Sequence, residues 1–200
     1  MRGIDNMDNN AQIENLKLYI DFEEGLLLKD FTLLLNGFNS LHKQLSILTL
    51  SESKTYKLIE ILERRYYRET NYRNRRSHSH VRNSIQQFSS RNTEPLAIKK
   101  FSEGSLWIEL ISNPLVTDLL LPILSAGGAT AVEEILRPKF AKFFRNSNPE
   151  NSNIENQLAE EITDSMVRDC KIIHKTLSDS KIKQFSLVYE DGKEIEIRIK

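Results

Sequence analysis

The feature that most constrains this chain is its apolar centre, residues 105–145. Within it, the fourteen residues 119–132 carry no charge. A helix that crosses a bilayer needs about 20 mostly apolar residues. Extending the run toward its N-terminal side would place Glu109 and Asp118 in the hydrocarbon, at a cost of about 3 kcal/mol for each carboxylate. We therefore expect this centre to be folded interior or contact surface rather than a membrane span.

Two prolines divide the apolar centre. Pro114 and Pro122 each lack a backbone donor, and a proline inside a helix clashes with the preceding turn. The pattern therefore predicts a strand at 105–111, a short helix at 115–121 and a second helix at 123–136.

Small residues fill the second of these helices, over 125–131. Small side chains allow a backbone to approach another helix or a strand closely. Three interpretations stay open: a helix packed on its own sheet, a contact between copies of the chain, or insertion in or on a membrane. The residues that we expect to carry an interaction are Leu119, Leu120, Ile123, Ala126, Gly127 and Gly128.

The apolar centre ends in a segment that is both basic and aromatic, residues 139–145. This composition suits an anchor at a membrane interface. More often, however, such a composition marks a helix end whose aromatic side chains pack inward.

Composition limits the expected cellular location and the possible partners of the protein. The 28 basic residues balance the 28 acidic ones, so any attraction for nucleic acid or anionic lipid must be local. Cys170 is the only cysteine, which excludes an internal disulfide and fits a reducing compartment. Residues 1–15 lack the apolar core of a signal peptide. We expect a cytoplasmic protein, with membrane association possible only through 106–145.

Hydrophobic periodicity predicts most of the remaining elements. Apolar residues alternate over 16–22, as in a half-buried strand. Spacings of three and four predict amphipathic helices over 31–48, 51–67 and 154–177. In the second of these, we expect Tyr56, Ile59, Leu62 and Tyr66 to share one side.

Two hairpins are expected as well. Residues 96–98 and 106–108 flank a turn near Gly104. At the C-terminal end, a three-residue loop at 191–193 would pair Tyr189 with Ile195 and Leu187 with Ile197, which keeps both apolar sets on one face.

These elements predict an α+β fold, mainly an antiparallel sheet of about five strands with helices on one face. We expect a disordered start at 1–11 and a single domain over 12–200. Within that domain we expect a mobile basic insert at 71–92 and a polar linker at 146–153.

The basic insert is the strongest candidate for a partner site. From Arg64 to Arg91 there are eight arginines and one acid, Glu69, with few aliphatic residues. Arginine forks onto phosphate through two parallel hydrogen bonds, and aromatic rings stack on unpaired bases. The alternatives are a solvated loop and an anionic lipid surface. The candidate residues for nucleic-acid binding are Arg64, Arg65, Arg68, Tyr72, Arg73, Arg75, Arg76 and Arg82.

Two resemblances follow from these segments. The order of the strand at 16–22, the helix at 31–48, a strand entered through 104–108 and a small-residue apolar helix resembles small bacterial α+β proteins; it implies a bacterial source and no activity. Residues 73–78, Arg-Asn-Arg-Arg-Ser-His, resemble the short signature of HEPN ribonucleases. That likeness implies that Arg73 steadies a phosphate, Asn74 positions the groups and His78 transfers a proton in metal-independent RNA cleavage.

No other motif names a reaction. His78 and His80 lack a third ligand of suitable spacing, so we expect neither a metal nor a cofactor. The leading hypothesis is a non-enzymatic module that assembles with itself or with a protein partner through 115–136. The alternatives are RNA or single-stranded nucleic-acid binding by 64–91 and membrane association by 106–145.

Overall fold

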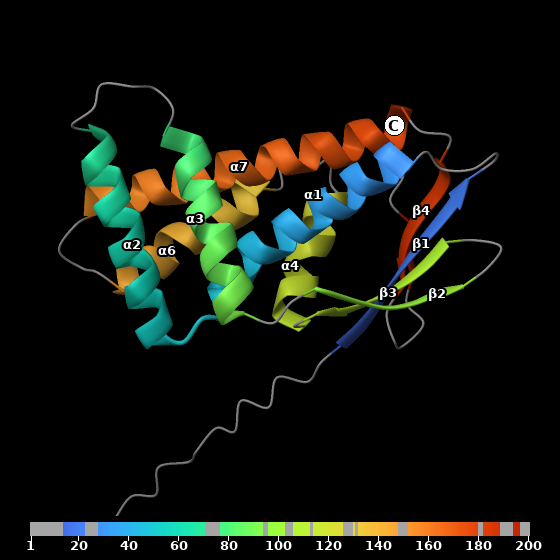
Figure 1. Cartoon of the computed structure of the whole chain (residues 1–200), viewed down its shortest axis with the longest axis horizontal. Helices are drawn as coiled ribbons and strands as arrows, with labels where there is room; N and C mark the ends of the chain where they lie inside the picture. Colours follow the sequence, from blue (N-terminus) through green and yellow to red (C-terminus); the bar gives the residue numbers. More distant parts are fainter. Residues whose placement is uncertain are drawn as a thin grey trace, which may run out of the picture.

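The computed structural model describes residues 14–22, 28–70, 77–93, 96–102, 106–112, 114–125, 130, 132–147, 152–179, 182–188 and 194–196. The expected disordered start, 1–11, lies outside these residues. Most of the described chain is helical (Figure 1). The helical elements are α1 (Leu28–Ser46) with a 3₁₀ turn (Ile47–Thr49), α2 (Glu52–Thr70), α3 (Ser77–Asn92), α4 (Pro114–Ser125), a π-helical segment (Val132–Leu136), α6 (Arg137–Ser147) and α7 (Ser152–Asp179).

Five segments pair as strands beside the helices, at one end of the molecule (Figure 1). Their order is β2-β3-β1-β4-β5, and every neighbouring pair is antiparallel. The strands are β1 (Glu14–Phe22), β2 (Ala97–Ser102), β3 (Leu106–Ser112), β4 (Ile182–Val188) and β5 (Glu194–Glu196).

The expected fold class, an α+β protein built mainly on a five-stranded sheet, is wrong. Of the residues whose side chains are described, 94% are helical, and the strands contribute only Ile20 and Ser186. The strands are defined almost wholly by their backbone pairing, with Ile20 of β1 in the core. The physical reason is that the long amphipathic helices bury their apolar sides mainly against one another, so the packed interior lies between helices.

The centre of that interior is the contact between α1 and α7. Leu34, Phe38, Leu41 and Leu45 of α1 are at most 1% exposed, at the spacing that the sequence predicts. The α7 residues that recur at three and four are likewise buried, which confirms both helical patterns: Leu158, Ile162, Met166, Cys170, Ile173 and Leu177.

Gly37 explains how closely these two helices approach. A Cβ atom at this position would lie 2.7 Å from Cγ1 of Ile173. Because real Cβ atoms do not come this close to a neighbour, glycine at 37 sets the α1–α7 distance. The helix-weakening residue is therefore there for packing.

The apolar centre of the chain forms α4, which does not break at its second proline. The predicted division at Pro122 is wrong, because α4 runs from Pro114 to Ser125 with Pro122 inside it. Val116, Ile123 and Leu124 are fully or almost fully buried, and α4 packs against α1. This burial offsets the backbone hydrogen bond that the proline removes. Across the described residues, every helix is too short or too polar to traverse a bilayer.

The helix predicted at 123–136 is divided. Its first residues belong to α4, its last belong to the π-helical segment, and 126–129 and 131 lie outside the described residues. In α6, Phe140 and Phe144 are 0% exposed. Phe143 is half-buried, with its ring edge-on to that of Phe144 at 5.2 Å. The aromatic side chains of this basic segment therefore pack inward.

The predicted mobile insert at 71–92 is wrong for most of its length. Residues 77–92 form helix α3, and 71–76 lie outside the described residues. The helix buries Val81, Ile85 and Phe88 at the helical spacing of three and four. Small polar residues complete this face, so the segment needs few aliphatic residues to pack.

Three local predictions also differ from the structure. In α2 the buried side is formed by Thr55, Leu58, Ile59 and Leu62, whereas Tyr56, expected among them, is 50% exposed. In the C-terminal pair, Leu187 lies opposite Ile195 rather than Ile197, so the predicted register is off by two residues. Of the expected linker at 146–153, residues 146–147 belong to α6 and 152–153 to α7.

Candidate nucleic-acid interface and the polar cluster beneath it

Helices α2 and α3 form a neighbouring pair, and six arginines of the chain fall in the sequence between the last turns of α2 and the start of α3. The pair is joined by residues 71–76, so the end of α2 and the start of α3 lie together (Figure 1). Three arginines fall in the last two turns of α2, and three more fall in the joining sequence: Arg64, Arg65, Arg68, Arg73, Arg75 and Arg76. We call residues 64–76 the basic end.

Arg64 is the member of the basic end whose side chain the structure describes. Its side chain is 72% exposed, and its guanidinium lies 2.5 Å from a carboxylate oxygen of Glu60, one turn earlier on α2. An exposed pair of this kind contributes at most a few tenths of a kcal/mol. Arg64 is therefore available to a stronger anionic partner at little cost.

Helix α3 is held on the body of the protein by polar contacts as well as by its three apolar residues. Ser89 is fully buried and donates a hydrogen bond of 2.7 Å to the carbonyl oxygen of Lys43 on α1. Lys54 of α2 donates to the carbonyl oxygen of Asn92 at the end of α3, at 3.0 Å. These bonds fix α3 along its C-terminal half.

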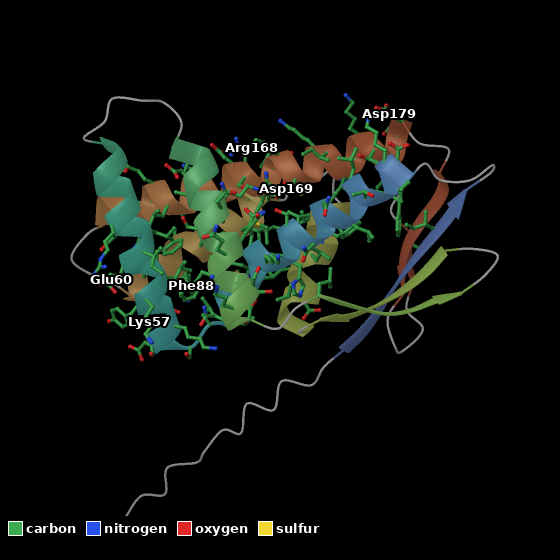
Figure 2. All side chains as sticks on the ribbon, viewed as in Figure 1. Lys57, Glu60, Phe88, Arg168, Asp169 and Asp179 are labelled. Atoms are coloured by element: carbon green, nitrogen blue, oxygen red, sulfur yellow. The ribbon has the colours of Figure 1, made fainter. Side chains whose placement is uncertain are left out.

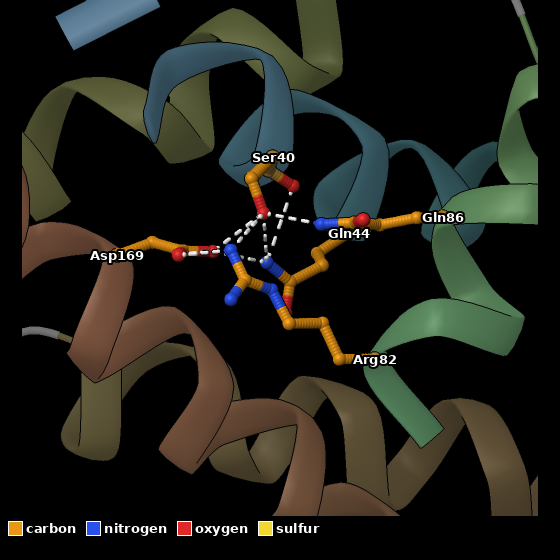
Figure 3. A network of polar contacts seen from close by, with 5 residues as sticks. All are labelled: Ser40, Gln44, Arg82, Gln86 and Asp169. Carbon is orange, nitrogen blue, oxygen red and sulfur yellow. Dashed lines mark hydrogen bonds and ion pairs between the residues drawn. The ribbon is translucent and has the colours of Figure 1, made fainter. Parts of the chain in front are cut away.

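A buried polar cluster fixes the middle of α3 (Figure 3). Asp169 of α7 is its centre: one carboxylate oxygen accepts from Ser40 Oγ at 2.6 Å and from Gln44 Nε2 at 2.8 Å, both on α1. The other oxygen accepts from Arg82 of α3 at 2.5 Å. Gln86, one turn further along α3, donates to Ser40 Oγ at 2.7 Å. The cluster thus joins α1, α3 and α7 through five side chains.

The electrostatics of the cluster are those of a buried carboxylate with satisfied oxygens. Asp169 is 1% exposed, and this burial raises the pKa of its carboxyl group, while the bond from Ser40, the charge of Arg82 and the bond from Gln44 act in the opposite direction. A buried charge without partners is very costly, so each of these partners is needed. The Arg82 side chain is 34% exposed, so its positive charge is partly in contact with solvent.

The structure therefore gives Arg82 a role that the sequence did not reveal. It is the one predicted nucleic-acid residue in α3, and it is engaged with Asp169 rather than free in a loop. Ser40, Gln44, Gln86 and Asp169 were not predicted as a group. The only signal for them is that they are polar positions next to the apolar faces of α1, α3 and α7.

The other predicted nucleic-acid residues are placed only in part. Arg65 and Arg68 lie on α2, and their side chains are not described. Tyr72, Arg73, Arg75 and Arg76 lie outside the described residues. The HEPN-like pattern is divided in the same way, because His78 lies in the first turn of α3, whereas Arg73 and Asn74 lie outside the described part.

The residues predicted to carry an interaction are mostly interior. Leu119 is 9% exposed, Leu120 is 5% exposed and Ile123 is 0% exposed. Ala126, Gly127 and Gly128 lie outside the described residues. Packing of α4 against α1 accounts for the apolar character of the described part, and assembly through 115–136 stays a prediction.

Cys170 and His42 are both buried. Burial raises the pKa of the Cys170 thiol to about 12, with a further contribution from Asp169. Burial, and to a lesser extent Lys43, lowers the pKa of His42 to about 4. In the part of the chain that the structure describes, no three His, Cys, Asp or Glu residues are grouped as metal ligands.

Comparisons with protein-family models, with curated protein sequences and with solved structures found no match to this chain. The function must therefore be argued from the chemistry and placement of its own residues.

Proposed function

We propose that this protein binds single-stranded RNA or DNA through the basic end of the α2–α3 pair. The observation that supports the proposal is the concentration of six arginines within residues 64–76, with Glu69 as the only acid, at one end of two packed helices. The molecule as a whole has no net charge, so this density is local. A local basic patch of this kind is the electrostatic footprint of a nucleic-acid-binding surface.

The chemistry of the segment suits an unpaired strand. Each arginine forks onto phosphate oxygens, and neutralised phosphates release their counterions, which contributes most of the affinity. Tyr66, Tyr67 and Tyr72 are interleaved with the arginines in the sequence. Aromatic rings stack on unpaired bases at about 1–3 kcal/mol per base. A strand whose bases are accessible therefore gains more from this segment than a duplex does.

The buried cluster supports the proposal because it holds in place α3, the helix that follows the basic end. Asp169 of α7 and Ser40 of α1 hold Arg82 and Gln86, in the middle of α3. An arginine segment anchored at both ends loses less conformational entropy on binding than a free tail. We infer that the cluster serves affinity indirectly, through the position of α3.

The test is binding of fluorescently labelled poly(U) and poly(dT) oligonucleotides by wild-type protein and by the triple variant R64A/R65A/R68A. We expect the variant to bind at least tenfold more weakly at low salt. Each single-strand phosphate that the variant no longer neutralises should lower the slope of log K against log salt by about 0.7, so three phosphates give about 2.

The matched control is K139A/K142A/R145A, which removes three exposed basic residues of α6 and changes the net charge by the same amount. This control should bind within a factor of about two of wild type. Failure of the wild-type protein to bind either oligonucleotide, or an equal fall in affinity for both triple variants, would contradict the proposal.

A further inference from the structure

The second half of α7 carries exposed charges of one sign. Arg168, Lys171 and Lys175 are exposed, whereas Asp169, the one acid between residues 165 and 178, is buried. Positions three, four and seven apart share one side of a helix, so the three basic residues form a single line. We call them the α7 strip. None of the three forms an ion pair with another described residue.

The strip begins where α3 meets α7. Arg168 lies beside the first turns of α3, next to Asp169 (Figure 2). Asp169 holds Arg82 of α3, and the charges of both Arg82 and Arg168 act on its carboxyl group. Arg82 therefore connects the start of α3, where the basic end finishes, with the first residue of the strip.

We propose that the α7 strip is the second half of the nucleic-acid site, so that one strand contacts the arginines at the end of α2, passes Arg82 and continues along α7. This inference rests on the proposed function and extends it. The occupant is the phosphate backbone of single-stranded RNA or DNA, because the strip presents long basic side chains without an intervening exposed acid.

The dimensions and composition of the strip fit that occupant. Lys175 follows Arg168 by seven positions, which is about 10 Å along a helix at 1.5 Å per residue. Ile172, between them on the same side, is 42% exposed and offers an apolar contact to a base or sugar. Exposed acids, Asp164 and Asp179, bound the strip at its two ends. The strip is thus a short contact that adds to the basic end.

The experiment compares R168A/K171A/K175A with the α6 control K139A/K142A/R145A and with R64A/R65A/R68A, using poly(U) oligonucleotides of increasing length. Short oligonucleotides that fill only the basic end should bind the strip variant as they bind wild type. Longer ones should bind it about five- to tenfold more weakly than wild type. The salt slope for longer oligonucleotides should fall by about 2, as expected for three single-strand phosphates.

The outcomes separate the two proposals. Affinity that falls for R64A/R65A/R68A but stays unchanged at every length for the strip variant would overturn the strip alone. Absence of wild-type binding would overturn the proposed function and the strip together. A third outcome concerns lipid. If the wild-type protein bound vesicles of anionic lipid at least as tightly as it binds the oligonucleotides, and the strip variant lost that binding, the strip would be assigned to a membrane surface and the inference would be overturned.

Discussion

A single buried histidine, His42, links the stability of this protein to pH. The residue is 3% exposed on α1, and its Nδ1 atom lies 3.5 Å from Ser46 Oγ. Burial and Lys43 lower its pKa from 6.5 to about 4. The folded protein therefore keeps the ring neutral at pH values where the unfolded chain has already bound a proton. Above pH 6.5 the ring is neutral in both states, and the free energy of unfolding has its full value. As the pH drops from 6.5 toward 4, the unfolded chain gains a proton that the folded protein does not bind, so the free energy of unfolding falls.

The prediction at this residue is that His42→Leu flattens the pH dependence of unfolding. Between pH 6.5 and 4, His42 should lower the free energy of unfolding of the wild-type protein by about 3 kcal/mol, at about 1.4 kcal/mol for each pKa unit. Urea unfolding at several pH values between about 4 and 7 measures it. The pKa of His174 is also lowered by burial, but that residue is present in both proteins, so the difference between them reports His42. Parallel pH profiles for the two proteins would refute the assignment.

Gly37 and Asp169 mark what can and cannot be inferred from residues one at a time. Glycine in a long helical pattern signals a local weakness, but only the structure shows that Ile173 fills the space of the missing side chain. Asp169 reads as one of several acids on an amphipathic helix. Its partners lie 125 and 129 residues away on α1, and no local pattern connects them.

At the scale of elements, α3 is the helix whose position depends most on polar contacts. Its apolar anchors are Val81, Ile85 and Phe88, and its other attachments to α1 and α7 are hydrogen bonds and the pair between Arg82 and Asp169. A helix with so few buried apolar side chains opens more readily than the α1–α7 core.

We predict that Asp169→Ala releases α3 selectively. Removing one partner of a buried pair costs about 3–5 kcal/mol, and less is expected here because Arg82 is one-third exposed and can turn toward water. Amide hydrogen exchange should accelerate in α3, while the centre of α1 keeps its protection. Glu60→Ala, which breaks the exposed pair with Arg64, serves as the control and should leave exchange in α3 unchanged.

If α1 and α3 became equally unprotected in Asp169→Ala, the cluster would be part of the general core rather than the attachment of one helix. Weaker oligonucleotide binding together with selective opening of α3 would connect the cluster to the basic end. The selectivity of the opening is visible in the exchange data alone, whatever the variant does to binding.

The elements also show why sequence periodicity succeeds in some segments and fails in others. The faces of α1 and α7 are long and rich in leucine and isoleucine, so their spacing is unambiguous. In α3, serines at 84 and 89 take buried positions, and their small polar side chains conceal the buried face from a pattern of apolar residues. In the C-terminal pair, a shift of two residues keeps the same side chains on the same face, so alternation alone leaves the register undetermined.

At the scale of the whole molecule, the balanced net charge conceals an uneven distribution. Basic residues gather in the last turns of α2 and on the exposed side of the second half of α7, while α6 carries a separate basic face with aromatic residues buried beneath it. The packing that holds this arrangement lies between helices: α7 packs against α1, α3 and α6. A surface that spans α2, α3 and α7 therefore exists only in the folded protein.

The burial of the apolar centre leads us to a last prediction, which concerns the molecule as a whole. Ile123 is 0% exposed within the core that α4 forms with α1, so its side chain stabilises the single chain. Ile123→Ala should lower the free energy of unfolding by about 2–5 kcal/mol, because the smaller side chain buries less apolar surface and leaves a cavity. Leu33→Ala, at a position 38% exposed on α1, is the control and should change the free energy of unfolding by about 0.5 kcal/mol or less.

Because the packing around Ile123 lies within one chain, the destabilisation by Ile123→Ala should be the same at low and high protein concentration. A destabilisation that grows on dilution, with parallel dissociation of an oligomer in sedimentation, would instead assign α4 to a contact between copies.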